Sequence, residues 1–388
     1  MKILFVPSWY PNEKNPISGN FVKEIAKALS LYDDVVVIHA FSDKSGGFYD
    51  NIEEEGVRVI RVKFRNLPFL THFQYFISIF KAFKKVKKEL GRIDVINAHV
   101  YYPAGLSALI LGKIYKIPVV ITEHAEIIDR YKQGRLKYLK DALRIMIAKF
   151  VFRKTNLIIT VSYSLQKHIK SFGIENDYAV VPNVINIDFF KQESKKGEKN
   201  EGGEENTKRI IFIGGLTPQK GVPYLLEALK IIKNRGRSDF FMHIIGDGPF
   251  RGKYEEMAKD IEINDRVKFH GKMIGEDKLR LLKESDFMVL PSLYESFGVV
   301  LLEAMACGKP VITTLSGGQK EFVNENTGIL VPPKDANALA DAIEYMLDHC
   351  HEYSPQKLHK YVRENFSYEK IGRQLHEVYE SVRDKWGK

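Results

Sequence analysis

Short runs of β-branched and aromatic residues alternate with amphipathic segments along the chain, and this alternation restricts the fold more than any other feature of the sequence. A strand followed by a crossover helix is the unit from which parallel sheets are built, so the pattern predicts α/β structure. The strand-like runs of the first half lie at residues 3–7, 35–39, 57–63, 95–99, 119–123, 157–161 and 179–182. Several are apolar at successive positions, which is typical of strands that helices cover on both faces.

The alternation stops between residues 191 and 208 and then starts again. The interval contains Lys, Glu, Gly, Asn and other polar residues without one large apolar side chain, a composition typical of a flexible linker. Strand-like runs follow at residues 209–213, 240–245, 267–270, 287–290, 311–314 and 329–331. A chain of 388 residues also exceeds what one hydrophobic core usually serves.

We therefore predict two doubly wound α/β domains that face each other across a cleft. The first covers residues 1–188, a linker covers 189–208, and the second covers 209–367. The apolar spacing near the end of the chain predicts one long helix, which we expect to pack back on the first domain over residues 368–388. Ligands of open α/β sheets bind outside the carboxyl ends of the strands, so the loops that follow the strands are the candidate sites.

The cysteine count and the hydropathy indicate the cellular compartment of the protein. Cys307 and Cys350 are too few for a disulfide framework and lack the spacing of a metal site, which favours a reducing compartment. No apolar stretch reaches the ~18 to 20 residues that a membrane-spanning helix needs. We therefore expect a cytoplasmic protein.

The net charge of +10 comes entirely from the first half of the chain. Residues 1–190 contain 28 Lys and Arg against 18 Asp and Glu, whereas the rest contains 31 of each. The segment 64–92 interleaves lysines with aromatic and aliphatic residues, a composition that favours peripheral contact with an anionic membrane surface, here the inner face. An ordinary amphipathic helix whose aromatic residues face a sheet explains the same pattern, and both interpretations stay open.

The densest motif follows a predicted strand that ends at Leu290. It contains Glu295, the turn Ser296-Phe297-Gly298 and then Glu303, with seven residues between the two glutamates. A Gly-containing turn at a helix start presents backbone N–H groups and the positive end of the helix dipole, which favours a diphosphate. Glu303 stands within the apolar run Val-Val-Leu-Leu-Glu-Ala-Met-Ala, where an unpaired carboxylate is costly, so a plain solvated residue is a poor explanation for it.

This motif resembles the signature of the retaining glycosyltransferases of family 4, which have the GT-B fold. Further segments that resemble the family are Pro16 to Val22, Ala98 to Gly105, Thr122-Glu-His124, Pro182-Asn-Val184, Ile213 to Gly221, Gly246 to Pro249, Phe269-His-Gly271 and Thr327 to Asp335. The resemblance therefore covers nearly the whole chain. It implies two facing Rossmann-like domains, of which the first binds the acceptor and the second binds the donor.

The resemblance also implies an activity and its partners. The enzyme would move a sugar from a nucleoside-diphosphate sugar, UDP- or GDP-linked, to a hydroxyl of a glycan or of a lipid-linked glycan, with retention and without a cofactor. Glu295 would contact the hydroxyls of the donor sugar, and the N–H groups of Ser296, Phe297 and Gly298 would hold the diphosphate. Glu303 would bind the ribose hydroxyls, since a carboxylate can accept two neighbouring O–H groups.

Three further residues complete the implied donor site. Lys220 would neutralise the leaving diphosphate, and Gly19 would let the backbone approach the donor closely. His124 would contact the donor sugar near the reacting centre, so His124 and Glu295 are the catalytic candidates, although a histidine at a strand end is often only a structural residue. One departure is Gly215, because many family members have an arginine there.

Absent motifs limit the alternatives. Without an Asp-x-Asp pair the sequence lacks the usual metal-holding carboxylates of the other large glycosyltransferase fold, so we expect a metal-independent reaction. A Gly-x-Gly-x-x-Gly after the first strand and a P-loop are absent too, which disfavours dinucleotide oxidoreductases and P-loop kinases. Two alternatives remain: a nucleotide-sugar epimerase of the same architecture, and a non-catalytic protein that binds anionic lipid or another polyanion.

Overall fold

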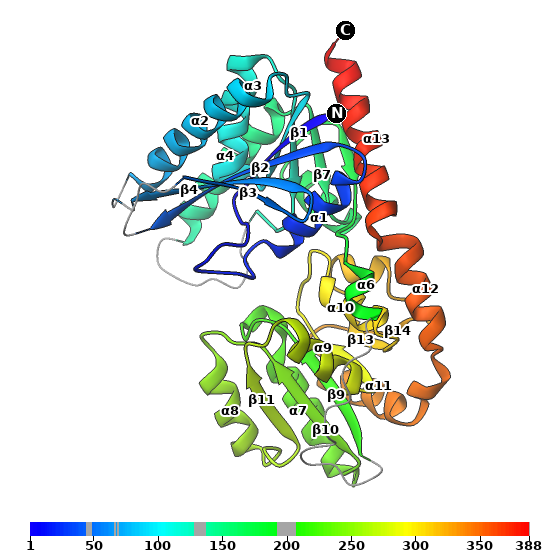
Figure 1. Ribbon diagram of the computed structural model, residues 1–388. Coiled ribbons are helices and arrows are strands. Elements are labelled where there is room, and N and C mark those ends of the chain that lie inside the picture. Colours follow the sequence, from blue (N-terminus) through cyan, green and yellow to red (C-terminus); the bar gives the residue numbers. More distant parts are fainter. Residues whose placement is uncertain (44–48, 66, 68–69, 128–136, 192–206, 388) are drawn as a thin grey trace. The chain divides into compact units, whose positions relative to one another are not determined.

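The computed structural model describes residues 1–43, 49–65, 67, 70–127, 137–191 and 207–387. Its contacts divide the chain into two units, each with a sheet of its own (Figure 1). The first unit comprises Met1–Ile185 and Phe366–Lys388, and the second comprises Asn186–Asn365. The chain therefore forms most of the first unit, then the second, and returns to the first with its last helix.

The first unit contains an eight-stranded sheet. Its strands, in the order in which they lie side by side, are β3 (Tyr49–Glu54), β4 (Val57–Arg65), β2 (Asp34–Asp43), β1 (Lys2–Pro7), β5 (Val95–His99), β6 (Val119–Glu123), β7 (Leu157–Thr160) and β8 (Tyr178–Val180). All neighbours are parallel except β3 and β4, which form an antiparallel hairpin. Strand β3 was not predicted, because its sequence Tyr-Asp-Asn-Ile-Glu-Glu has no apolar run.

Helices cover both faces of this sheet. They are α1 (Asn20–Ser30), α2 (Thr71–Leu90), α3 (Leu106–Tyr115), α4 (Lys137–Lys154), α5 (Tyr163–Lys170) and α13 (Tyr368–Trp386), with the short helical segment η1 (Tyr101–Gly105) before α3. Because strand-helix-strand crossovers are right-handed, α1 lies on one face and α2 to α5, which lead the opposite way along the sheet, lie on the other. Figure 1 shows α1 beside α13, with α2, α3 and α4 grouped away from them.

The last helix shares its core with this sheet. Ile371, Leu375 and Tyr379 of α13 are buried together with strand residues such as Phe5 and Val37. The apolar spacing near the end of the chain predicted one long helix, and the structure has it at Tyr368–Trp386.

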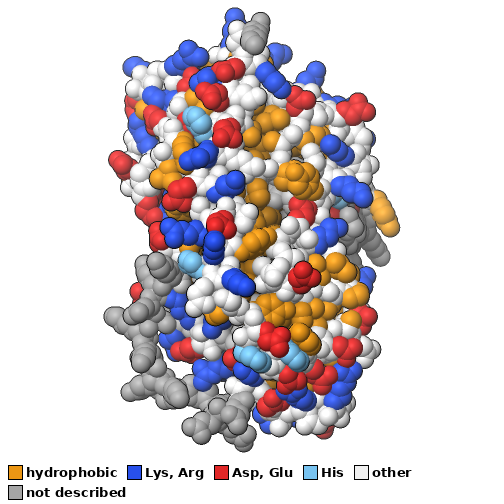
Figure 2. Space-filling model, turned by 90° about the vertical axis from the view of Figure 1, so that its right-hand side faces the viewer, with side chains coloured by type: hydrophobic (Ala, Val, Ile, Leu, Met, Phe, Trp, Pro, Cys, Tyr) orange, Lys and Arg blue, Asp and Glu red, His pale blue; other side chains and the backbone are white. Residues whose placement is uncertain are grey.

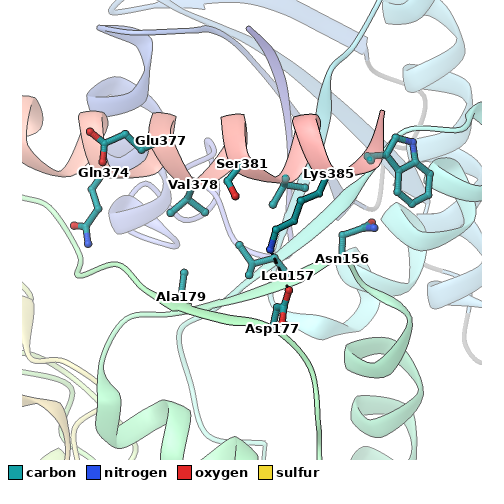
Figure 3. Close-up of a pocket in the computed structure, with 11 residues that line it drawn as sticks. Asn156, Leu157, Asp177, Ala179, Gln374, Glu377, Val378, Ser381 and Lys385 are labelled. Carbon is teal, nitrogen blue, oxygen red and sulfur yellow. Dashed lines mark hydrogen bonds and ion pairs between the residues drawn. The ribbon is translucent and has the colours of Figure 1, made fainter. Parts of the chain in front are cut away.

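The edge of the sheet at β8 lies alongside α13 (Figure 3). Val378 of α13 projects toward Leu157 and Ala179 of the last two strands, and Lys385 forms an ion pair with Asp177 at 3.5 Å. A cavity of about 460 Å³ separates the helix from the strands. The C-terminal helix thus lies next to β8, the last strand on this side of the sheet.

The second unit contains a six-stranded sheet in which all neighbours are parallel. Its strands, side by side, are β11 (Val267–Gly271), β10 (Phe240–Ile245), β9 (Lys208–Ile213), β12 (Phe287–Leu290), β13 (Val311–Thr314) and β14 (Gly328–Val331). Its helices are α6 (Ile187–Lys191), α7 (Val222–Asn234), α8 (Arg251–Asp260), α9 (Gly275–Glu284), α10 (Val299–Ala306), α11 (Ala336–His349) and α12 (Pro355–Phe366), with short 3₁₀ turns η2 (Pro218–Lys220), η3 (Gly318–Glu321) and η4 (Cys350–Glu352).

The predicted linker at 189–208 falls largely outside the described residues. Residues 192–206 belong to that part, whereas α6 extends to Lys191 and β9 begins at Lys208. Among the helices that the structure describes, none is long and apolar enough to cross a membrane.

The order of the second sheet creates a switch point between β9 and β12. The chain proceeds from β9 to β10 and β11 on one side, then returns and proceeds from β12 to β13 and β14 on the other. The loops after β9 and β12 therefore leave the sheet toward opposite faces, which opens space between them at the carboxyl edge. The first sheet has the same arrangement, with its switch point between β1 and β5.

Candidate functional site

The loop after β9 is held close to the loop after β12 by a glycine. Gly221 precedes α7 with a φ of 67°, and a Cβ at this position would lie 2.1 Å from the carbonyl oxygen of Pro291. Only glycine allows both the backbone conformation and this close approach. Lys220, the residue before it, is thereby brought to the switch point of the sheet.

The backbone of Glu295 is fixed from the neighbouring loop. The N–H of Gly318 donates to the carbonyl oxygen of Glu295 at 2.8 Å, and the N–H of Glu295 donates to Ser316 at 3.3 Å. Gly317 has a φ of 101°, and a Cβ there would lie 2.0 Å from the same carbonyl oxygen. Glu295 therefore occupies a defined position, although it belongs to a loop.

Lys220 and Glu295 form an ion pair at this point. One carboxylate oxygen of Glu295 contacts the ammonium of Lys220 and also accepts a hydrogen bond of 2.7 Å from the hydroxyl of Ser292. The Glu295 side chain is 11% exposed and that of Lys220 is 23% exposed, so both remain partly accessible. The pair offers a cation and an anion side by side, which suits a ligand that has both phosphate and hydroxyl groups.

The start of α10 lies in the same loop region. Gly298 precedes the helix with a φ of 93°. The carbonyl oxygen of Gly298 accepts a hydrogen bond of 3.0 Å from the N–H of Leu301. N–H groups nearer the helix start have no carbonyl partner within the helix, so this end favours an anion. Phe297 has a packing role as well, because its ring is buried against Phe322 with 5.0 Å between the centroids.

Glu303 has a partner that the sequence did not indicate. Both of its carboxylate oxygens accept from the ammonium of Lys278 on α9, at 2.9 and 2.8 Å. Together with Val299 and Val300, Glu303 forms the half-buried side of α10, whereas the other helix residues are buried. Lys278 thus compensates the charge of a carboxylate whose burial without a partner would cost free energy. The sequence could not predict this pair, because the two residues belong to different helices.

Gly215 is not required by the backbone. A Cβ at this position would meet only the carbonyl oxygen of Asp247, at 3.9 Å, and its φ lies outside the left-handed region. A larger residue fits here, so the departure from the basic residue of many family members is a difference in charge rather than a steric necessity.

In the first unit, Gly19 is required by a close contact. It precedes α1 with a φ of 67°, and a Cβ there would lie 2.2 Å from the carbonyl oxygen of Trp9. The loop after β1 therefore folds back on itself at this glycine, next to the switch point between β1 and β5.

His124 belongs to a buried hydrogen-bonded network at the carboxyl edge of the first sheet. Its Nε2 lies 2.9 Å from Nδ1 of His99, and Nε2 of His99 lies 3.3 Å from the Asn97 amide. That amide also donates to the hydroxyl of Tyr379 on α13 at 2.7 Å, and its oxygen accepts from Thr122 at 3.1 Å. Asn97 and Tyr379 were not predicted as members of this network, because they are 282 positions apart in the sequence.

Burial keeps the two imidazoles neutral. It lowers the pKa of His124 to about 3, an effect that the polar side chain of Asn183 opposes only in part. Burial, and secondarily the charge of His124, also lower the pKa of His99 well below its ordinary value. Near pH 7 both rings therefore act as neutral donors and acceptors of hydrogen bonds.

Glu123, next to His124, is a titratable group that the sequence analysis did not single out. Its carboxylate accepts hydrogen bonds from the backbone N–H groups of Tyr101, His124 and Ala125 at 3.1, 3.0 and 3.3 Å. Burial nevertheless raises its pKa to about 7. Glu123 fixes the backbone around His124, while the functional assignment of His124 itself stays a prediction.

Two family models match the chain and together cover most of it. Residues 18–189 match the model described as "Glycosyltransferase Family 4", and residues 192–365 match "Glycosyl transferases group 1". An uncharacterized glycosyltransferase of Methanocaldococcus jannaschii is 30% identical over 356 residues, which are 88% of each chain. A putative teichuronic acid biosynthesis glycosyltransferase of Bacillus subtilis is 27% identical over 98% of this chain and 99% of its own.

Solved structures have the same fold. Sucrose-phosphate synthase from Thermosynechococcus elongatus is similar with a TM-score of 0.77 and 21% identity, over 98% of this chain and 99% of its own. HepE of Anabaena, solved in complex with UDP, is similar with a TM-score of 0.73 and 20% identity, over 98% and 100%. The predicted GT-B fold class is confirmed, and neither the epimerase nor the non-catalytic binder gains support from these relatives. The chain belongs to the group 1, family 4 glycosyltransferases.

Proposed function

We propose that this glycosyltransferase uses a nucleoside-diphosphate sugar as its donor and holds it in the second unit. The observation that carries the proposal is the Lys220–Glu295 pair at the switch point between β9 and β12, beside the start of α10. A cation and a helix N-terminus together suit a diphosphate. Structures of the similar HepE in complex with UDP and with UDP-glucose support the same donor class.

Different groups of this site bind different parts of the donor. Lys220, the N–H groups of the Ser296-Phe297-Gly298 turn and the first N–H groups of α10 bind the diphosphate. Glu295 accepts hydrogen bonds from the hydroxyls of the sugar, and Glu303 accepts hydrogen bonds from the ribose. Lys278 holds the carboxylate of Glu303 and keeps it oriented toward that ligand.

The reaction proceeds with retention and without a metal. The nucleoside diphosphate departs, an oxocarbenium-like transition state forms, and a hydroxyl of a glycan or lipid-linked glycan attacks from the face that the leaving group vacates. Fixed N–H groups and the ammonium of Lys220 stabilise the charge that develops on the leaving oxygen, which is the main catalytic effect. Glu295 serves as a hydrogen-bond acceptor rather than as a nucleophile, and neutral His124 contacts the donor sugar.

Ligand-induced stabilisation tests the donor class. In thermal denaturation with UDP, GDP, ADP and their sugars, we expect one nucleoside diphosphate to raise the melting temperature, because a ligand at 100 times its Kd adds about 2.7 kcal/mol to the free energy of unfolding. Glu303→Ala and Lys278→Met should each reduce that rise, since both disturb the ribose contact. Glu256→Ala on the exposed side of α8 is the matched control and should keep the full rise. A panel in which no nucleotide stabilises the parent protein contradicts the proposal.

Chelation tests the role of metal. Turnover with the stabilising donor should survive excess EDTA, because Lys220 and the helix N-terminus supply the positive charge that a divalent ion supplies elsewhere. Initial rates with and without EDTA, in buffers matched for ionic strength, measure the effect. Loss of activity in EDTA together with recovery on addition of manganese contradicts the metal-independent scheme.

A further inference from the structure

The solvent-facing side of α2 presents large apolar residues although its inner side is already packed. Tyr75, Ile79 and Phe83 are buried against the sheet, so part of the segment 64–92 behaves as an ordinary amphipathic helix. A second row on the same helix, Phe73, Ile77 and Phe80, is exposed, with Phe73 at 63%. Lys81, Lys84, Lys85 and Lys88 are exposed on this helix as well.

The more extensive exposed row lies on α4, which the sequence analysis did not single out. Leu139, Leu143, Met146 and Phe150 follow one another at the spacing of a single helix face. All four are exposed, with Leu139 at 69% and Met146 at 61%. A hollow of about 670 Å³ on this helix is lined by apolar residues together with Lys149, Arg153 and Lys154.

The helix α3 joins the two rows. It contacts both α2 and α4, and its Ile110 and Ile114 are exposed in turn. The outward sides of α2, α3 and α4 therefore form one surface on the same face of the first sheet. We call the exposed apolar residues of these three helices and the lysines and arginines among them the basic apolar surface.

The three helices that carry this surface have a large excess of positive charge. The helices α2, α3 and α4 contain twelve Lys and Arg against two carboxylates, Glu89 and Asp141. Their excess equals the net +10 of the chain. By contrast, α13 on the opposite face of the sheet contains four residues of each sign, and Figure 2 shows cationic and anionic side chains interspersed on the side of the molecule where α13 lies.

We propose that the basic apolar surface binds an anionic lipid bilayer, with α4 as the helix that inserts its apolar row most deeply. Apolar side chains that enter the acyl boundary and cations that face lipid phosphates are the two components of interfacial binding. A second copy of this chain fits the surface poorly, because two faces with this excess of positive charge repel each other. The contact is independent of the donor site, which belongs to the second unit.

Vesicle flotation tests the proposal on the full chain. The protein should float with vesicles of phosphatidylcholine and phosphatidylglycerol at low salt, float far less with phosphatidylcholine alone, and detach as salt rises, because screening weakens the attraction to lipid phosphates. Absence of the parent protein from the vesicle fraction overturns the proposal. Equal binding to neutral vesicles overturns its electrostatic part.

Matched variants separate α4 from other exposed residues. Leu143→Gln, Met146→Gln and Phe150→Gln, combined, should reduce partitioning by at least about tenfold, because three exposed side chains lose their apolar contact with lipid. Leu31→Gln, Ile274→Gln and Tyr345→Gln replace three side chains of similar exposure away from this surface and should leave partitioning unchanged.

Further measurements keep the outcome interpretable. Melting curves and nucleotide-induced stabilisation should match the parent for both variants, since all six positions are exposed. Unchanged partitioning of the α4 variant overturns the role of α4. The combined change of Lys84, Lys85 and Lys88 on α2 to Gln should weaken binding to anionic vesicles, and a salt dependence that stays the same contradicts the contribution of α2.

Discussion

Replacing Lys220 with Met should lower kcat by about 10²- to 10³-fold, which corresponds to about 2.7–4 kcal/mol of lost transition-state stabilisation. In the proposed donor arrangement the ammonium lies where charge develops on the departing diphosphate, and in the structure it contacts Glu295. Steady-state kinetics at saturating donor separate this effect from weaker donor binding, and single-turnover rates separate the chemical step from product release.

A lysine elsewhere in the same unit provides the control. Lys230 on α7 forms an ion pair with Glu262, as Lys220 does with Glu295, but lies far along its helix from the loop after β9. Lys230→Met should keep the kcat of the parent. If Lys220→Met also keeps it, the diphosphate is neutralised by other groups and the assignment is wrong. A melting curve should accompany each variant, since removal of Lys220 leaves Glu295 without its ion pair.

Replacing Glu295 with Gln should lower turnover by roughly one to two decades, because a charge-assisted hydrogen bond is worth about 1.5–3 kcal/mol. The protein should stay folded: the hydroxyl of Ser292 can donate to an amide oxygen as it does to the carboxylate, and the backbone bonds of Glu295 are unaffected. Rates measured over a range of donor concentrations, with Glu256→Gln on α8 as the control, give the effect. Near-parental turnover at saturating donor rules out the proposed contact with the sugar.

The sequence predicts the elements that depend on local patterns. The parallel strands can be predicted because a buried run of β-branched residues is recognisable within a short stretch of sequence. The last helix can be predicted because its apolar spacing is regular. The hairpin strand β3 escapes because its residues are polar and its register depends on β4. The exposure of the outward apolar row of α4 is not predicted for a related reason. A sequence pattern shows that a helix has an apolar side, but it does not show which side the sheet covers.

The candidate site likewise contains residues that the sequence predicts and residues that it does not predict. The loop motif around Glu295 and the glycines at 19, 221 and 298 leave a local signature, and the structure shows what conformations the glycines adopt. Lys278 opposite Glu303 and Tyr379 beside Asn97 leave none, because each contact joins residues whose proximity only the folded chain creates. The same holds for the lowered pKa of His124, since its cause is burial.

The pairing of Lys220 with Glu295 also has a consequence for the release of the nucleoside diphosphate after each catalytic cycle. In the structure the ammonium is already satisfied by an internal carboxylate, so an incoming diphosphate has to compete with Glu295 for it. The same competition works in reverse on the product. In the proposed arrangement, loss of the sugar leaves Glu295 without the hydroxyls that it contacts, and we expect the freed carboxylate to displace the phosphate from Lys220. We therefore expect the ion pair to limit product inhibition and to shorten the residence time of the spent nucleotide.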